Sequence, residues 1–224
     1  RNAPISLNIT NATINGGWHA LGASTTVQAA GSTITAVLFR TNKGVYNKVE
    51  VTGPDDTNTD IGNTTINNLL FSNTSTASQV WIRSNNTINR LEFKGRGYIQ
   101  ATGNVIDTLI FAPGKIYTFA AGTNTTINEA SYGSGSPCNP TQIISSSTTA
   151  NATVTKTSGT VDFDYVRLNP ITAAGVTPFK AREHSVDLGG NVNWDISPYD
   201  NSATITGLGP DRTVCGGAFP LVLV

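Results

Sequence analysis

Five heptapeptides repeat along the first part of the chain, and this repeat restricts the fold more than any other feature. They align without gaps and end at residues 51, 71, 93, 111 and 132, so the steps between them are 20, 22, 18 and 21 residues. A β unit of about 20 residues is too small to bury a core alone, so consecutive units must stack on one another. The repeat therefore predicts an all-β fold, a parallel β-helix (β-solenoid) with coils of about 20 residues. The copies are residues 45–51 (VYNKVEV), 65–71 (TINNLLF), 87–93 (TINRLEF), 105–111 (VIDTLIF) and 126–132 (TINEASY).

The composition agrees with a fold built from strands. The chain has 224 residues, and its 33 threonines and 23 asparagines make up a quarter of them, with 22 glycines in addition. These three residue types have low helix propensity, so we expect no substantial helix.

Within the heptapeptide, residues alternate as a strand with one buried side requires. Positions five and seven should face the core and position six the solvent, because successive side chains of a strand point to opposite sides. Position three should lie at a corner of the coil, where its side chains would form a hydrogen-bonded ladder. Residues 33–39 (TITAVLF) resemble a sixth copy that is out of step by 12 residues. The position-three residues are Asn47, Asn67, Asn89, Asp107 and Asn128.

Less regular β segments continue to about residue 195, which predicts a parallel β-helix over residues 1–204 with roughly nine stacked coils. The last residues, 219–224 (FPLVLV), read as a strand cut in the middle. We therefore expect the chain to be a piece of a longer protein.

Charge excludes two classes of partner. The chain carries 14 Lys and Arg against 14 Asp and Glu, for a formal net charge of zero. Nucleic-acid binding and membrane-surface binding by bulk electrostatics both need a cationic excess, so we expect neither. All apolar runs are too short for a membrane-spanning helix, so we expect no membrane insertion. Low charge together with many Thr, Asn and Ser residues and no Met favours an exported protein.

The segments after Cys138 carry a family resemblance. Residues 136–147 (SPCNPTQIISSS), 164–168 (DYVRL) and 185–194 (SVDLGGNVNW) resemble the closing coils of β-helical regions in large Bacteroidetes surface adhesins. Such adhesins are exported by the type IX secretion system and are often linked to gliding motility. Residues 207–215 (GLGPDRTVC) are similar to the opening strand of the immunoglobulin-like modules that follow such helices.

This resemblance implies several properties of the chain. Residues 205–224 would be a linker and the truncated first strand of an immunoglobulin-like module. The protein would be secreted to the cell surface of a Gram-negative bacterium, with the type IX secretion machinery and further domains of the same chain as partners. Cys215 would pair with a cysteine further along its own module. A Cys138–Cys215 disulfide and two buried thiols are the alternatives.

Candidate catalytic groups are few, although parallel β-helices include polysaccharide lyases and hydrolases. Glu50 and Glu92 share position six but lie two coils apart, about 10 Å by stacking. Asp162 and Asp164 flank one residue of a strand and should point the same way, without an evident third group. His184 cannot form a triad with its strand neighbours, since adjacent residues point to opposite faces. We therefore expect no catalytic residues and no enzyme.

One cluster of aromatic and cationic residues is a candidate ligand-binding strip. Its members fall in two neighbouring coils, where they could stack on sugar rings and hold acidic substituents. In the alternative interpretation, the tryptophan belongs to the core and the cations keep one face soluble. The residues are Trp81, Arg83, Arg90, Lys94, Arg96 and Tyr98.

Calcium is the only cofactor that the sequence suggests. Asp56, Asn58 and Asp60 have the i, i+2, i+4 spacing that lets oxygen ligands converge in a tight loop. The match is partial, because Ile61 and Asn67 stand where a calcium loop has Gly and Glu. A solvated turn is the alternative.

These observations together predict a structural and adhesive segment of a large secreted surface protein, which binds glycans or other surfaces. The alternative is a carbohydrate-active β-helix enzyme. A smooth Thr/Asn face would favour the adhesin, and a cleft lined by three or more charged groups would favour the enzyme.

Overall fold

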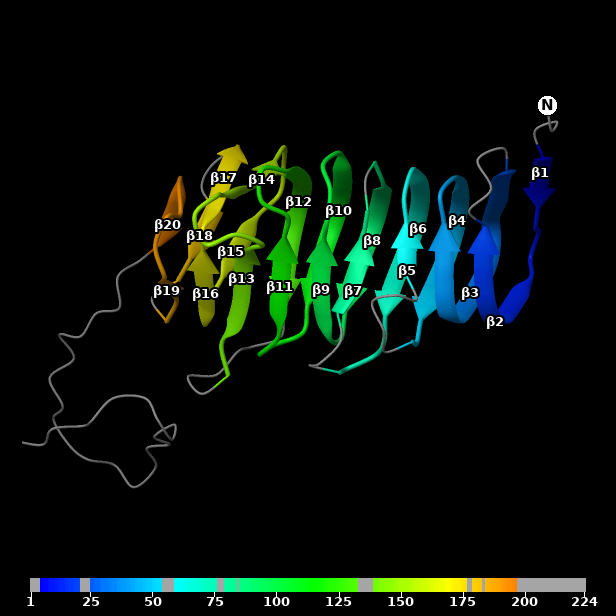
Figure 1. The fold of residues 1–224 in the computed structure, drawn as a ribbon, viewed down its shortest axis with the longest axis horizontal. Coiled ribbons are helices and arrows are strands. Elements are labelled where there is room, and N and C mark those ends of the chain that lie inside the picture. Colours follow the sequence, from blue (N-terminus) through cyan, green and yellow to red (C-terminus); the bar gives the residue numbers. More distant parts are fainter. Residues whose placement is uncertain are drawn as a thin grey trace, which may run out of the picture.

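The heptapeptides form β-strands that stack in parallel, one coil above the next, as their spacing predicts (Figure 1). In the computed structural model the chain makes a β-solenoid of about eight turns. The model describes residues 5–20, 25–53, 59–75, 79–83, 85–132, 139–176, 179–182 and 184–196. All regular elements in these ranges are strands, and they contain no helix that could span a membrane. The prediction of an all-β solenoid with coils of about 20 residues is confirmed, whereas the predicted immunoglobulin-like strand lies outside the described residues.

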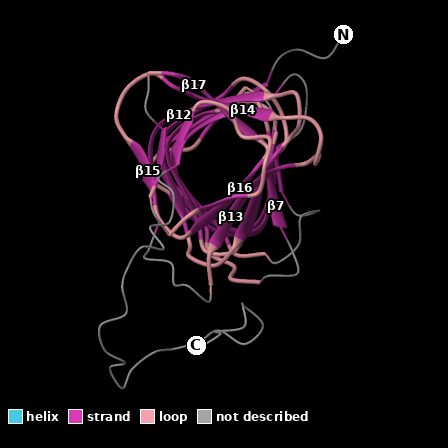
Figure 2. Ribbon diagram, turned by 90° about the vertical axis from the view of Figure 1, so that its left-hand side faces the viewer, coloured by secondary structure: helices cyan, strands magenta, loops and turns pink. Residues whose placement is uncertain are grey.

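Each coil contributes strand segments to three faces that surround the core (Figure 2). The long strands turn a corner at position three, where the pairing skips one residue between Tyr46 and Lys48 and at the equivalent place in each later copy. We call the part before this corner face 1 and the part after it face 2. The long strands are β3 (Thr25–Thr41), β4 (Gly44–Val51), β6 (Thr64–Phe71), β8 (Thr87–Phe93), β10 (Asn104–Phe111) and β12 (Asn124–Tyr132).

In the later coils the two faces are formed by separate strands. Face 1 continues with β14 (Ala152–Lys156) and β17 (Ile171–Gly175), and face 2 with β15 (Val161–Phe163), β18 (Phe179–Ala181) and β20 (Trp194–Ile196). At the other end, β1 (Ile5–Asn8) and β2 (Thr13–Ala20) form the first coil against β3.

Face 3 is the row of strand segments that begins with residues 18–20 of β2 and 39–41 of β3 and continues with short strands. Its members are β5 (Thr59–Ile61), β7 (Gln79–Ile82), β9 (Arg96–Ile99), β11 (Ile116–Phe119), β13 (Thr141–Ser145), β16 (Val166–Asn169) and β19 (Val186–Asp187).

Alternating burial fills the core as the heptapeptide predicts. Positions five and seven are buried in the first four copies, and position six is partly exposed. The rings at position seven contribute to an aromatic stack, in which Phe71 and Phe93 lie 5.1 Å apart with nearly parallel planes. Tyr117 extends the stack from face 3 at 5.6 Å from Phe93, and its hydroxyl group donates to the carbonyl of Ala112. Burial raises the pKa of the Tyr117 hydroxyl above its ordinary value.

The predicted side-chain ladder runs along the corner between faces 1 and 2, and it is interrupted once. Asn67 Nδ2 donates to Asn47 Oδ1 at 3.1 Å, and Asn89 Nδ2 donates to Asn67 Oδ1 at 2.9 Å. Asn128 Nδ2 donates to Asp107 Oδ1 at 3.1 Å. Every donor thus belongs to the later coil, and an ionised Asp107 has no proton to offer to Asn89. The described structure accordingly contains no hydrogen bond between Asn89 and Asp107.

A second ladder, which the sequence reasoning missed, lies inside the corner that leads into face 1. Asn86 and Asn104 are fully buried, and Asn86 Nδ2 donates to Asn104 Oδ1 at 2.9 Å. Asn86 Nδ2 also donates to the Ile61 carbonyl at 2.9 Å, and Asn104 Nδ2 donates to the Ala101 carbonyl at 2.8 Å. The Ile61 carbonyl also accepts the Arg83 amide, whereas the Ala101 carbonyl lies in a turn, where the Asn104 side chain satisfies it. The signal was present, because a polar residue directly precedes the heptapeptide at residues 64, 86, 104 and 125.

The prediction of a sixth heptapeptide at residues 33–39 was wrong. Thr33 pairs with Lys48, and Ala36 pairs with Val51, so Phe39 lies three residues beyond the seventh position. Phe39 instead begins face 3, where it pairs with Thr59. The pairing shifts register between Ala29 and Thr33, which is how β3 accommodates extra residues at the corner.

Completing the outer ladder should stabilise the solenoid. In Asp107→Asn, a new Nδ2 group can donate to Asn89 Oδ1, and we expect the free energy of unfolding to rise by about 0.5 kcal/mol. The matched control is Asn67→Asp, which removes the donor to Asn47 and should lower it by a similar amount. Urea unfolding measures both variants. If the two substitutions change stability in the same direction, the ladder does not have the donor direction described above.

The aromatic stack also requires a glycine. A Cβ atom on Gly97 would lie 2.8 Å from Cε1 and 2.9 Å from Cζ of Phe93. Because Phe93 is packed between other rings, we expect Gly97→Ala to destabilise the protein by about 1–3 kcal/mol. Gly17→Ala is the control, since no atom lies within 4 Å of an added Cβ there. Equal unfolding midpoints for the two variants would contradict this packing.

Candidate functional site

Four residues of the predicted ligand-binding strip meet on face 3. Strands β7 and β9 pair so that Trp81 lies opposite Tyr98. Their rings are 5.0 Å apart at 73°, an edge-to-face contact on the outer side of the solenoid. Both side chains are partly exposed, because the alternation that buries Ile82 and Ile99 turns them outward. Arg96 also points outward from the start of β9, and Arg83 is exposed directly after β7.

The neighbouring coils add an ion pair and a further basic residue to this group. Arg83 Nε lies 2.6 Å from Asp60 Oδ1, one coil below it. Asp60 in turn lies opposite Arg40 in the backbone register between β5 and β3. Sequence reasoning missed Arg40, because residues 33–39 were aligned with the wrong strand. Trp81 sits one coil above Asp60, since Ile61 pairs with Ile82.

The other two residues of the predicted strip belong to face 2. Arg90 Nη2 lies 2.9 Å from Glu92 Oε2, and Lys94 forms a second ion pair with the same carboxylate. A corner of the coil separates them from Trp81 and Tyr98. The six residues therefore form two groups, one aromatic and cationic, and one in which the cations surround an acid.

Face 1 has a different outer surface. Its outward position-one residues lie in register over successive coils and are all uncharged. Thr65, Thr87 and Val105 are exposed, and Thr126 and Thr155 are partly exposed. A column of threonines, with valine at residues 45 and 105, thus runs along this side of the described solenoid.

Only one of the three predicted calcium ligands, Asp60, belongs to the described residues. Asp56 and Asn58 lie outside the described residues, and Asp60 is the partner of Arg83. Within the described ranges, no three His, Cys, Asp or Glu side chains come together as a metal site would require. Calcium binding at residues 56–60 stays a prediction. Cys138 and Cys215 also lie outside the described residues, so their pairing stays open.

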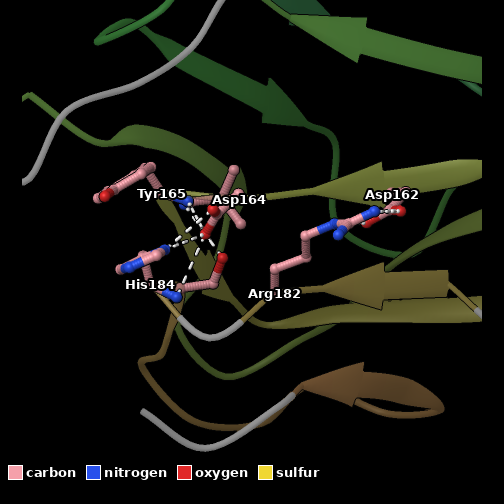
Figure 3. Close-up of polar contacts among 7 residues, drawn as sticks. Asp162, Asp164, Tyr165, Arg182 and His184 are labelled. Carbon is pink, nitrogen blue, oxygen red and sulfur yellow. Dashed lines mark hydrogen bonds and ion pairs between the residues drawn. The ribbon is translucent and has the colours of Figure 1, made fainter. Parts of the chain in front are cut away.

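The two aspartates near the end of the solenoid each bind a basic side chain of the next coil (Figure 3). Arg182 holds Asp162 in a bidentate pair, with Nε–Oδ1 and Nη2–Oδ2 distances of 2.9 and 2.5 Å. His184 Nδ1 lies 2.9 Å from Asp164 Oδ2, and the His184 ring stacks on Tyr165 at 4.4 Å. These contacts join two neighbouring coils at their outer edge, where exposed ion pairs contribute about 0–1 kcal/mol each.

The same cluster tests the triad geometry. Ser185 is buried, and its Oγ accepts a hydrogen bond from the Val166 amide at 3.3 Å. His184 instead faces outward toward Asp164. The two side chains therefore point to opposite sides as expected, but both residues precede β19 and do not lie on a strand.

Comparisons with known proteins give no guide to this surface. The chain matches no protein-family model, no curated protein and no solved structure. The chemistry of the three faces is therefore the basis for any functional inference.

The acidic group on face 2 has a measurable signature. The hydrogen bond from Lys94, and then that from Arg90, hold the pKa of Glu92 below its ordinary value. Ionised Glu92 thus stabilises the fold above that ordinary pKa, and this contribution is lost as the pH falls through the lowered value. We expect Lys94→Gln to raise the Glu92 pKa more than Arg90→Gln does, as measured by NMR titration of the side-chain carboxyl group. The opposite order would show that Lys94 is not the main partner.

Proposed function

We propose that this chain is a structural and adhesive segment of a large secreted protein, which presents face 3 to glycans on other surfaces. The observation that carries the proposal is the partly exposed Trp81–Tyr98 ring pair with Arg83 and Arg96 beside it. Aromatic rings with adjacent hydrogen-bond donors suit sugar rings, which have apolar faces and polar edges.

The solenoid supports an adhesive role by its shape. Its strands are paired above and below, so the rod is stiff and holds face 3 at a fixed orientation. A rod of this kind separates binding modules from the cell and also offers a lateral binding surface. Weak contacts then gain strength when many copies engage one surface at the same time.

The family resemblance of the segments after Cys138 supports a more specific proposal about where the protein is located. Residues 136–147 and 185–194 resemble the closing coils of Bacteroidetes adhesins, so the proposal places the protein on the cell surface of a Gram-negative bacterium. Export through the type IX secretion system, a role in gliding motility, and further domains of the same chain follow from this resemblance alone. The proposal includes binding without turnover of the bound glycan.

A glycan array tests this function. The full chain is applied to the array with calcium and again with EDTA, and released products are analysed from each retained glycan. We expect retention without release, and about tenfold weaker retention for the Trp81→Ala/Tyr98→Ala variant, because stacked rings contribute about 1 kcal/mol beyond their buried area.

The control variant is Leu70→Ala/Ile110→Ala, which removes two partly exposed apolar side chains from face 2. Thermal unfolding of both variants identifies any loss of fold. Retention that is absent in every condition would contradict the adhesive role, and so would equal losses in the two variants. Product release would favour the carbohydrate-active enzyme instead, and loss of retention with EDTA would direct attention to Asp56, Asn58 and Asp60.

A further inference from the structure

The charges of this electrically neutral chain are distributed unevenly over its three faces. The described outward positions of face 3 from β3 to β16 carry four arginines and one carboxylate, that of Asp60. Face 2 combines cations with acids, as in the group around Glu92. Face 1 is largely uncharged. Among the described outward positions of this stretch, arginines therefore outnumber carboxylates although the net charge of the chain is zero. The four arginines are Arg40, Arg83, Arg96 and Arg167.

The register places two of these arginines, Arg96 and Arg167, in one column along the axis of the solenoid. Gly97 pairs with Tyr117, so Arg96 has Ile116 as its neighbour in the next coil. Ile116 pairs with Gln142, and Gln142 pairs with Arg167. Three coils thus separate Arg96 from Arg167, a distance of about 14 Å at the usual strand spacing. A ligand that contacts both must be extended along the axis (Figure 1).

The aromatic pair lies in the adjacent outward column of the same face. Asp60, Trp81, Tyr98 and Thr118 occupy successive coils of this column. The sugar rings and the acidic groups of one bound polysaccharide would then contact different columns. The rings would lie over Trp81 and Tyr98, and the anionic groups would lie toward Arg96. The two columns are about 7 Å apart, the distance between alternate residues of a strand, so a single polysaccharide can contact both columns.

One arginine of face 3 already pairs with a carboxylate of the same face, and this contact shows how such an arginine holds an anion. Arg83 holds Asp60 at 2.6 Å, at the outer surface and next to the ring pair. The planar guanidinium group matches carboxylate and sulfate groups with two parallel hydrogen bonds, and it also stacks on flat rings.

We infer that face 3 binds an extended acidic polysaccharide along the solenoid axis, with its anionic groups at Arg96 and Arg167 and its sugar rings on Trp81 and Tyr98. This inference rests on the proposed glycan adhesion and names the ligand class. Uronic acid carboxylates and sulfate esters share the recognised chemistry. Because the contact is electrostatic and at the surface, binding weakens as salt concentration increases.

Binding measurements on the full chain separate these possibilities. The probes are polygalacturonate and its fully methyl-esterified form, dextran sulfate and dextran, and a single-stranded DNA oligonucleotide. We expect binding to polygalacturonate or dextran sulfate but not to their neutral counterparts. The acidic polysaccharide that binds more tightly identifies the carboxylate or the sulfate as the source of the anion.

Two variants with equal changes of charge locate the site. Arg96→Gln/Arg167→Gln should weaken acidic polysaccharide binding by about tenfold for each arginine, the usual effect of losing a hydrogen bond to a charged group. Lys48→Gln/Lys180→Gln removes two exposed cations from face 2 and should leave binding unchanged. Equal losses in the two variants would overturn the inference.

The remaining outcomes distinguish this inference from the proposed function. Binding to dextran or to the methyl ester that the arginine variant does not change would leave glycan adhesion standing and overturn the acidic ligand. Equally tight, arginine-dependent binding of DNA would show a general polyanion surface and also overturn it. Retention of no glycan on the array would instead contradict the adhesive function itself.

Discussion

Parallel backbone hydrogen bonding between successive coils is the interaction on which every other feature of this chain depends. It fixes residue by residue which side chains lie above one another, so that an alignment of heptapeptides becomes an alignment in space. The Asn ladder at the corner, the stacked phenylalanines and the outward columns of the three faces all follow from this register. A shift of one residue would exchange the buried and exposed sides of a strand. The register shifts of β3 against β2 and β4 lie where β3 has extra residues.

The core and the ladders support the register in different ways. Apolar positions five and seven supply most of the stabilisation through burial, but their packing alone would tolerate several stackings. The buried Asn86 and Asn104 are more selective, because each must meet particular carbonyl groups or remain unsatisfied at a cost of about 1–3 kcal/mol. The outer ladder adds little energy, and its interruption at Asp107 shows that the fold does not require it to be continuous.

Periodicity made the coil predictable, whereas the turns did not reveal which face each residue joins. The heptapeptides gave the strand positions, the inward and outward alternation and the corner at Asn67, because all of these depend on local pattern. The separation of Arg90 from Arg96 depends on the corner after Lys94, whose direction is set by contacts between coils. Arg40 was missed for a similar reason, since the extra residues near the start of β3 shift its later part relative to the repeat. Residues that are distant in sequence and share one face can be recognised only after the register is known.

The proposed ligand site depends on this register, which brings scattered aromatic and basic residues together on face 3 along the axis. A crystal structure of the chain with bound oligogalacturonate tests it most directly. We expect an oligosaccharide parallel to the solenoid axis, with a sugar ring against Trp81 or Tyr98 and a carboxylate at Arg96. An oligosaccharide that crosses the coils, or that occupies face 1 or face 2, would contradict it.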